Sequence, residues 1–179
     1  IDDNSPGSVI NKYIEHLKDA FMVSEAERYD IKGRKYIGAD SKYYFEDPGI
    51  RNAILGFRQV EFSHMMENVL YNELCARGYS VDVGLVEVWE KNEQGKMEHK
   101  ILEVDYVINR GSQRIYIQSA YMMPDQVKAA QEQRPLTKIS DSFRKVIISG
   151  DNYGKFYNDE GILRIGVFEF LLNVNCLDE

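Results

Sequence analysis

The sequence predicts an α/β domain with a core in the order α-β-β-β-α-β, preceded by a helix and a β-hairpin. Three observations support this fold class. Apolar residues recur at helical spacing between about residues 60 and 77, three alternating runs follow between residues 81 and 122, and a helical pattern and a short apolar run come after them. The chain of 179 residues, 44% apolar and 28% charged, is large enough to bury such a core.

The first predicted element is an amphipathic helix that ends near Ala20. Ser5 and Pro6 mark its start, because a capping residue stands before a proline at the first helical position. Apolar residues then recur at helical spacing, namely Val9, Ile10, Tyr13, Ile14, Leu17 and Phe21. The next run, FMVSEAERYDIKGRKYIG, predicts two strands joined at a hairpin tip around Lys32 and Gly33.

The middle of the sequence predicts two helices behind a short connector at residues 40–46 (DSKYYFE). Asp47 and Pro48 start the first of these helices, again as an acidic cap before a proline. The second helix is longer and runs from about Val60 to Arg77. It stops at Gly78, since glycine favours the position just after a helix end.

Beyond Gly78 the apolar pattern changes from helical to alternating. Three strands are predicted in the runs VDVGLVEVWE, HKILEVDYVIN and RIYIQSAYM. A helix is then expected from Pro124 to about Gln133, and residues 144–150 predict a short buried strand. The run GVFEFLLN near the end predicts a terminal helix.

The predicted order from residue 60 onward is that of the PD-(D/E)xK nuclease core, a sheet with helices on both of its faces. The helix and hairpin before it correspond to the back half of a winged helix. We therefore expect two domains, a winged-helix remnant at residues 1–40 and a restriction-endonuclease-like domain at residues 41–179. The sequence opens with IDDNSPGS and not with Met, which predicts a fragment of a longer protein.

Charge and composition argue against several functions. A net charge of −7 at pH 7 disfavours a strong stand-alone binder of duplex DNA, because neutralisation of phosphates supplies most non-specific affinity. Cys75, Cys176 and the three histidines lack the spacing of a metal or redox site. No apolar run approaches the roughly 20 residues of a membrane span, and no signal-peptide pattern opens the chain. We therefore expect a reduced, cytoplasmic protein without a membrane partner.

Two neighbouring strands carry the candidate site. Alternation places Glu103 and Asp105 on one face of the second strand, and Tyr116 and Gln118 on one face of the third. If the turn near Gly111 joins these strands as a hairpin, the two polar pairs are neighbours on the sheet. A carboxylate such as that of Asp105 suits Mg²⁺ or Mn²⁺, which prefer hard oxygen ligands.

Glu67 adds a second acid to this site. It lies within an apolar stripe of the long helix, where a carboxylate is costly unless it is paired or bound to an ion. Glu67, Asp105 and Gln118 therefore form the candidate catalytic set, with Asp105 and Glu67 as candidate metal ligands. The structural alternative is an ordinary half-solvated strand, with Glu67 paired to Arg77 or Arg51.

The candidate site lacks part of what hydrolysis needs. Metal-assisted cleavage of a phosphodiester requires acidic ligands and typically a lysine that positions or activates the water. Tyr116 keeps its proton at neutral pH and Gln118 carries no charge. The nearest lysines in the sequence, Lys100 and Lys128, are not at the required spacing. We therefore expect a vestigial nuclease-like site with weak metal affinity and little hydrolysis.

Five runs of the sequence together indicate a family: KYYFEDPGIRNAILGFRQVEFSHMMENVLYNELCARGYSVDVG, LEVDYVIN, YIQSAY, QRPLTKISDSFRKVII and GVFEFLLN. They resemble the C-terminal region of a group of prokaryotic AAA-superfamily ATPases, over residues 5–175. Proteins of this group carry an N-terminal P-loop ATPase module, a winged-helix segment and a C-terminal domain of unknown function with a nuclease-like fold. The resemblance implies the same arrangement here.

The family pattern matches Glu67, Asp105 and Gln118, and glutamine at the third-strand position is frequent in the family. The other matched positions are Asp47, Gly49, Asn68, Glu73, Arg134, Pro135, Leu136 and Lys145. No P-loop motif GxxxxGK[ST] is present, so the resemblance implies ATP binding only in an N-terminal module outside this sequence. That module of the same chain is then the first expected partner.

Three functions follow from these observations. The first is a non-catalytic accessory domain of an AAA-type ATPase, which recognises a nucleic acid, another protein or a second copy of itself in a homo-oligomer. The second is a Mg²⁺- or Mn²⁺-dependent nuclease that uses Glu67, Asp105 and Gln118. The third is a winged-helix DNA-binding regulator whose Lys12 and Lys18 contact phosphates.

Overall fold

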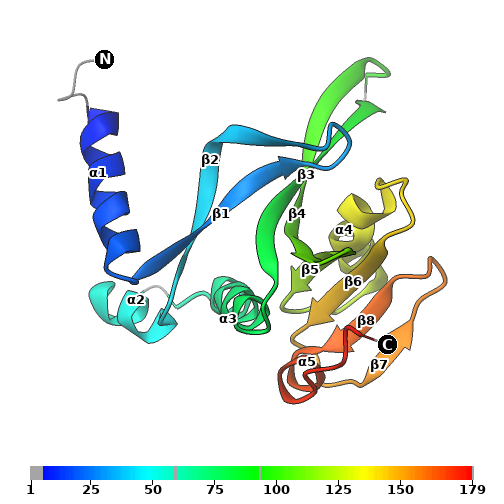
Figure 1. The fold of residues 1–179 in the computed structure, drawn as a ribbon. Coiled ribbons are helices and arrows are strands. Elements are labelled where there is room, and N and C mark those ends of the chain that lie inside the picture. Colours follow the sequence, from blue (N-terminus) through cyan, green and yellow to red (C-terminus); the bar gives the residue numbers. More distant parts are fainter. Residues whose placement is uncertain (1–5, 59, 93, 179) are drawn as a thin grey trace.

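The computed structural model describes residues 6–58, 60–92 and 94–178 and shows helices packed around one large β-sheet (Figure 1). The helices are α1 (Pro6–Asp19), α2 (Pro48–Ile54), α3 (Phe62–Ala76), α4 (Gln126–Thr137) and α5 (Val167–Leu172). The strands are β1 (Val23–Asp30), β2 (Lys35–Phe45), β3 (Ser80–Lys91), β4 (Met97–Arg110), β5 (Gln113–Ala120), β6 (Arg144–Ser149), β7 (Lys155–Tyr157) and β8 (Leu163–Gly166). None of the described helices has the length and apolar character needed to span a bilayer.

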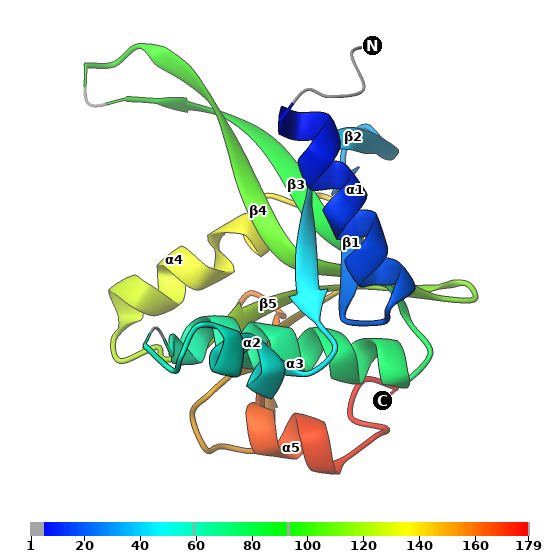
Figure 2. The ribbon, with the colours of Figure 1, turned by 90° about the vertical axis from the view of Figure 1, so that its left-hand side faces the viewer.

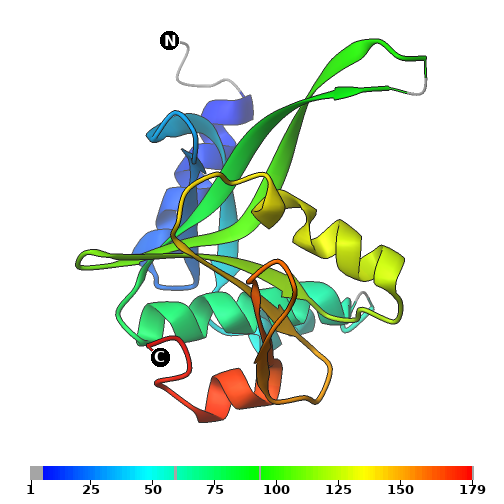
Figure 3. The same ribbon diagram turned by 90° about the vertical axis from the view of Figure 1, so that its right-hand side faces the viewer.

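The described strands form one mixed, eight-stranded sheet in the order β2-β1-β3-β4-β5-β6-β8-β7. The pairs β1–β2, β3–β4, β4–β5 and β7–β8 are antiparallel, whereas β1–β3, β5–β6 and β6–β8 are parallel. The long pair β3–β4 extends beyond the rest of the sheet (Figures 1 and 3). The predicted α/β class is therefore confirmed.

Apolar side chains cover both faces of the sheet and form two clusters. On one face, α3 contributes Leu70 and Leu74 and α5 contributes Phe170. On the other face, α4 contributes Leu136. Figure 2 shows α3 and α4 on opposite sides of β5. Each face of the sheet thus has its own helical cover, as expected for a sheet that is apolar on both sides.

The predicted α-β-β-β-α-β succession is confirmed as α3-β3-β4-β5-α4-β6, and the predicted terminal helix is α5. Helix α4 begins at Gln126 and not at Pro124, because the side chain of Asp125 caps it. That side chain accepts a hydrogen bond of 2.8 Å from the backbone N–H of Lys128. The strands β7 and β8 are missing from the predicted pattern, since they have only three and four residues.

The run at residues 40–46 continues a strand, so the expectation of a connector is wrong. β2 extends to Phe45 because its last residues pair with β1, where Phe45 lies opposite Val23. β1 in turn pairs in parallel with β3. The sheet is therefore continuous across residue 40, where the sequence places a domain boundary. The division into two domains stays a prediction.

Helix α1 lies apart from the main body and leads into β1 (Figure 1). Its Ile10 and Tyr13 side chains are exposed. The predicted helix and hairpin at the start of the chain are confirmed as α1 and the antiparallel pair β1–β2. Their assignment to a winged helix stays a prediction.

Candidate functional site

Lys42 holds together three acidic side chains from two other elements. Its ammonium nitrogen lies 2.6 Å from Oε1 of Glu103, 2.9 Å from Oε1 of Glu67 and 4.0 Å from Oδ1 of Asp105. Lys42 comes from β2, Glu67 from α3, and the other two acids from β4. We call these four residues the Lys42 cluster. The expectation that no lysine lies beside Asp105 is therefore wrong.

Strand pairing brings Lys42 to the acids. β2 pairs with β1, whose Arg28 donates a hydrogen bond of 2.7 Å to Oε2 of Glu103. Because side chains alternate along a strand, Lys42 and Tyr44 share one face of β2. The Tyr44 hydroxyl donates a hydrogen bond of 2.7 Å to Oε1 of Glu67. One strand therefore supplies two of the groups that bind the acids.

A β-bulge in β4 turns Asp105 toward the cluster. Asp105 and Tyr106 together lie opposite one residue of β3, Val83, so the alternation of β4 is reset at this point. Oδ2 of Asp105 accepts a hydrogen bond of 2.8 Å from the backbone N–H of Ser119. The Tyr106 hydroxyl donates one of 2.6 Å to the backbone carbonyl oxygen of Glu67. Both residues of the bulge are thus fixed by neighbouring backbone.

Burial and neighbouring charges set the ionisation of the cluster. Burial, followed by the negative charge of Glu67, raises the pKa of Asp105 to about 7. Burial also opposes ionisation of Glu103, but hydrogen bonds from Lys42 and Arg28 outweigh it and lower the pKa of this carboxyl. Burial opposes the charged form of Lys42 as well, yet the carboxylates outweigh it and raise the pKa of the ammonium. When Asp105 is protonated, the carboxylates of Glu67 and Glu103 face the cations of Lys42 and Arg28, and these charges balance.

The raised pKa of Asp105 predicts that the protein gains stability when the pH falls through about 7. The folded-state pKa lies above the ordinary value of 3.8, so the folded state binds the proton more tightly, and the free energy of unfolding rises between about pH 8 and pH 5. Asp105→Asn supplies a neutral side chain of similar shape at every pH. Urea unfolding at about pH 8 and pH 6 should show a smaller gain on acidification in Asp105→Asn than in the wild type. Equal gains in both proteins would contradict this assignment.

Gln118 does not join the Lys42 cluster. Side chains alternate along β5, so that Ile117 packs on the α3 face of the sheet, whereas Tyr116 and Ala120 pack on the α4 face. By this alternation Gln118 lies on the α4 face, where it is buried and its Oε1 has no hydrogen-bond partner among the described residues. The structure therefore brings the two predicted acids together and leaves the predicted glutamine on the opposite face.

The two lysines expected to contact phosphates both lie on α1. The ammonium nitrogen of Lys18 lies 2.5 Å from Oε2 of Glu25 and 3.0 Å from Oε1 of Glu15. Hydrogen bonds to these carboxylates raise the pKa of Lys18, and their charges offset the charge that a phosphate contact requires. Lys12 is exposed on the same helix.

The structural alternative for Glu67, an ion pair with Arg77 or Arg51, differs from what is found. Nε of Arg77 lies 2.8 Å from Oε1 of Glu73, and Arg51 donates a hydrogen bond to a neighbouring asparagine. The cation that binds Glu67 is Lys42, which no spacing in the sequence singles out.

A pocket of about 280 Å³ opens beside the cluster, between β2, α2 and α3. Lys42 and Glu67 contribute to its wall, together with Arg51 and His64. Within the described ranges, no group of three or more His, Cys, Asp or Glu side chains is arranged to hold a metal ion. The carboxylates of the cluster bind cationic side chains instead. This donor set therefore does not fit Mg²⁺ or Mn²⁺ as it stands.

Comparison with known proteins places the chain beside proteins without an assigned activity. A family model for a domain of unknown function (DUF8612) matches residues 5–61, which cover α1, the β1–β2 hairpin and α2. An uncharacterized protein of Haemophilus influenzae is 32% identical over 163 residues, which are 91% of this chain and 36% of that protein. The chain thus spans about a third of the length of this relative. No solved structure matches the chain.

Proposed function

We propose that this chain is an accessory domain of a larger AAA-type ATPase, built on a PD-(D/E)xK-like scaffold that serves recognition and does not hydrolyse phosphodiesters. The succession α3-β3-β4-β5-α4-β6 supports the scaffold. One observation supports the proposal that the domain does not hydrolyse phosphodiesters. The Lys42 ammonium is bonded to Glu67 and Glu103, where a divalent cation would have to bind.

Charge works against a divalent cation in the Lys42 cluster. A cation site needs oxygen ligands whose charge is not already offset. Glu103 accepts hydrogen bonds from both Lys42 and Arg28, and Glu67 accepts one from Lys42. Asp105 takes up a proton at about neutral pH. A divalent ion must therefore displace both the ammonium and the proton, which removes the ion pairs that compensate the buried charges.

A place within a larger protein is supported by the length of the relative. The matched region makes up 36% of the Haemophilus influenzae protein, so most of that protein lies outside the similarity. An ATPase module in the remainder would be a partner within one chain, and ATP would bind there. The cytoplasm is the compartment that fits such a partner.

Cleavage of DNA is the first test of this proposal. Plasmid and single-stranded DNA are incubated with the chain and Mn²⁺, beside an Asp105→Ala control. We expect both substrates to stay intact, because the cluster binds its own lysine in place of the metal. Cleavage by the wild type that disappears in Asp105→Ala would show that the cluster is catalytic and would overturn the proposal. Cleavage that is equal in both proteins identifies a contaminating nuclease.

A metal-dependent nuclease is the second candidate, and one observation favours it. Lys42 supplies beside Asp105 an ammonium group of the kind that water activation typically uses. We place this function second because the same ammonium is bonded to both glutamates of the cluster. For the third function, a winged-helix DNA-binding regulator, the pairing of Lys18 with acids is unfavourable.

A further inference from the structure

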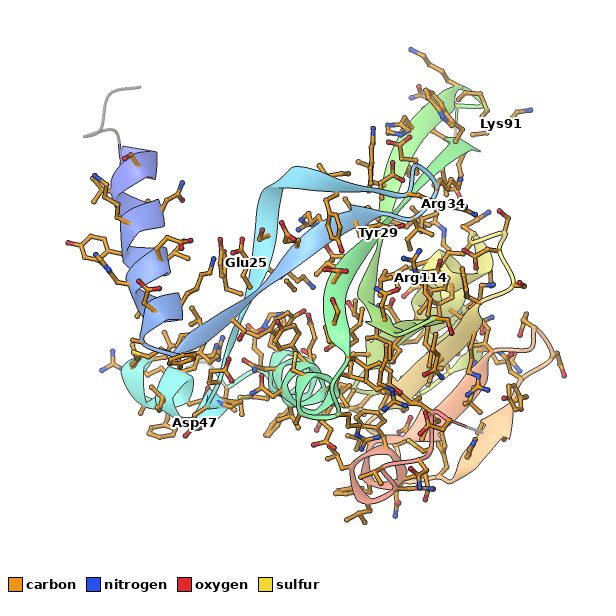
Figure 4. All side chains as sticks on the ribbon, viewed as in Figure 1. Glu25, Tyr29, Arg34, Asp47, Lys91 and Arg114 are labelled. Atoms are coloured by element: carbon orange, nitrogen blue, oxygen red, sulfur yellow. The ribbon has the colours of Figure 1, made fainter. Side chains whose placement is uncertain are left out.

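A second pocket, of about 340 Å³, lies between the turn that joins β1 to β2 and the turn that joins β4 to β5. Arg34 lines it from the first turn and Arg114 from the start of β5, with Tyr29 and Phe143 alongside. Figure 4 shows the labelled Tyr29, Arg34 and Arg114 near one another, at the end of the hairpin remote from α1. The residues that line this pocket include none of the Lys42 cluster.

Arg114 is held in place by neutral partners. Its Nε donates a hydrogen bond of 2.8 Å to Oδ1 of Asn109, and its Nη1 donates one of 3.1 Å to the Tyr29 hydroxyl. The guanidinium carbon lies 4.9 Å from the ring centroid of Tyr29 and 5.7 Å from that of Phe143. These contacts fix the orientation of the guanidinium through neutral hydrogen-bond acceptors and aromatic rings.

Arg34 is the second cation of the pocket. Its side chain is exposed, and the described part of the chain offers it no ion pair and no hydrogen bond. A guanidinium carries its donors in a planar fork that matches the oxygens of a phosphate. One preorganised arginine and one uncommitted arginine on the same pocket are therefore suited to bind an anion between them.

The acid that lines the pocket, Asp141, accepts hydrogen bonds from its neighbours. Oδ2 of Asp141 accepts a hydrogen bond of 2.7 Å from the Tyr116 hydroxyl, and Oδ1 accepts one of 3.1 Å from the backbone N–H of Phe143. Lys145 donates a hydrogen bond of 2.9 Å to the backbone carbonyl oxygen of Asp141, which brings a further cation to this side. The lining of the pocket thus contains two cations, Arg34 and Arg114, against one acid, on a chain with a net charge of −7.

The size and lining of the pocket narrow the class of anion. A volume of about 340 Å³ is at the lower end of small-molecule sites, which fits one nucleotide. The Phe143 ring is 40% exposed, so a flat base can stack on it. The side chain of Gln113, also in the lining, carries a donor and an acceptor for a base edge.

We propose that this pocket binds a nucleotide, with the phosphate on Arg34 and Arg114 and the base against Phe143. The nucleotide is either free or part of a single strand, since both present the same groups. This inference goes beyond the recognition role proposed above by assigning a site and a ligand class to it. It does not depend on whether the Lys42 cluster is catalytic.

Fluorescence anisotropy with labelled oligothymidylate tests the site on the whole chain. We expect Arg34→Gln to weaken binding about tenfold, because a charged hydrogen bond to phosphate is lost. The matched control is Arg58→Gln, which removes the same charge from an exposed arginine between α2 and α3. Arg34 has no partner to lose, so Arg34→Gln should keep the melting temperature of the wild type. Phe143→Leu tests the stacking and should also weaken binding.

Competition distinguishes the two sources of the nucleotide. If unlabelled thymidine monophosphate displaces the probe, the pocket takes a free nucleotide, whereas displacement by unlabelled oligothymidylate alone identifies a single strand. Either result supports the proposal when Arg34→Gln weakens binding more than Arg58→Gln. The proposal is overturned if neither oligothymidylate nor thymidine monophosphate binds at millimolar concentration. It is also overturned if Arg34→Gln and Arg58→Gln bind the labelled oligothymidylate equally well.

Discussion

Replacing Lys42 by methionine should lower the free energy of unfolding by about 3 kcal/mol. Methionine keeps the length of the side chain but removes the ammonium that compensates Glu67 and Glu103. The side chains of Lys42 and Glu67 are 27% and 18% exposed, so the remaining acids are only partly hydrated when their partner is lost. We place the loss at the lower end of the range for breaking a buried ion pair, because the cluster is not fully dry. Urea unfolding monitored by circular dichroism measures it.

Lys91→Met is the control for this prediction. Lys91 is exposed at the end of β3, and Figure 4 labels it near the tip of the extended β3–β4 pair. Removal of its charge should change the free energy of unfolding by no more than about 0.5 kcal/mol. If Lys42→Met is as stable as Lys91→Met, the ammonium is not what holds the acids together, and our account of the cluster is wrong.

Arg77→Met should lower the free energy of unfolding by about 3 kcal/mol and increase local unfolding in the C-terminal part of the chain. The Arg77 side chain is only 6% exposed. Its Nη2 donates a hydrogen bond of 2.5 Å to the backbone carbonyl oxygen of Phe170. Its guanidinium carbon lies 4.1 Å from the centroid of the Phe170 ring. Its Nη1 lies 3.4 Å from the carbonyl oxygens of Asn173 and Val174. Arg77 therefore gives a partner to the Phe170 carbonyl in the last turn of α5 and ties the segment after that helix to α3.

Hydrogen exchange gives this prediction a local readout. In Arg77→Met we expect faster exchange at residues 167–178, with α4 and β6 much less affected, because the lost contacts other than the ion pair with Glu73 lie on α5 and the segment after it. Arg110→Met is the matched control, since Arg110 is exposed and pairs with Asp178 at 2.6 Å. Arg110→Met should lower the free energy of unfolding by less than about 1 kcal/mol. Equal exchange in the two variants would refute the role given to Arg77.

The regular elements were accessible to sequence analysis because their patterns are long. The apolar spacing of α3 and the alternation of β3, β4 and β5 are each carried by at least eight residues. The strands β7 and β8 have only three and four residues, too few to show a period. The sequence predicts the first part of β2 as a strand but not its second part, because the run DSKYYFE is polar at its start, although Lys42 and Tyr44 alternate with Tyr43 and Phe45 as in a strand.

The candidate site was only partly predictable, for two physical reasons. Glu67 could be found because an acid in an apolar helical stripe needs a partner, yet the partner comes from a distant strand that only the folded sheet brings near. Gln118 was assigned to the site on the assumption that β4 and β5 alternate without interruption. The bulge at Asp105 and Tyr106 breaks that assumption, and no local sequence signal marks it.

The pocket proposed to bind a nucleotide could not be predicted from the sequence for a similar reason. Arg34 was part of a hairpin tip and Arg114 part of a strand, and neither belongs to a recognisable motif. The parallel pairing of β1 with β3 carries the hairpin tip toward the turn between β4 and β5. Net charge, which argues against a strong stand-alone binder of duplex DNA, averages over the whole chain and does not report a local pair of arginines.

We propose that the Lys42 cluster is closed to divalent cations by its own lysine. Calorimetric titration of the wild-type chain with Mn²⁺ at neutral pH tests it most directly. We predict no saturable heat at millimolar Mn²⁺, because the Lys42 ammonium is already bonded to Glu67 and Glu103. Saturable binding of one Mn²⁺ by the wild type that Asp105→Asn abolishes would contradict the account.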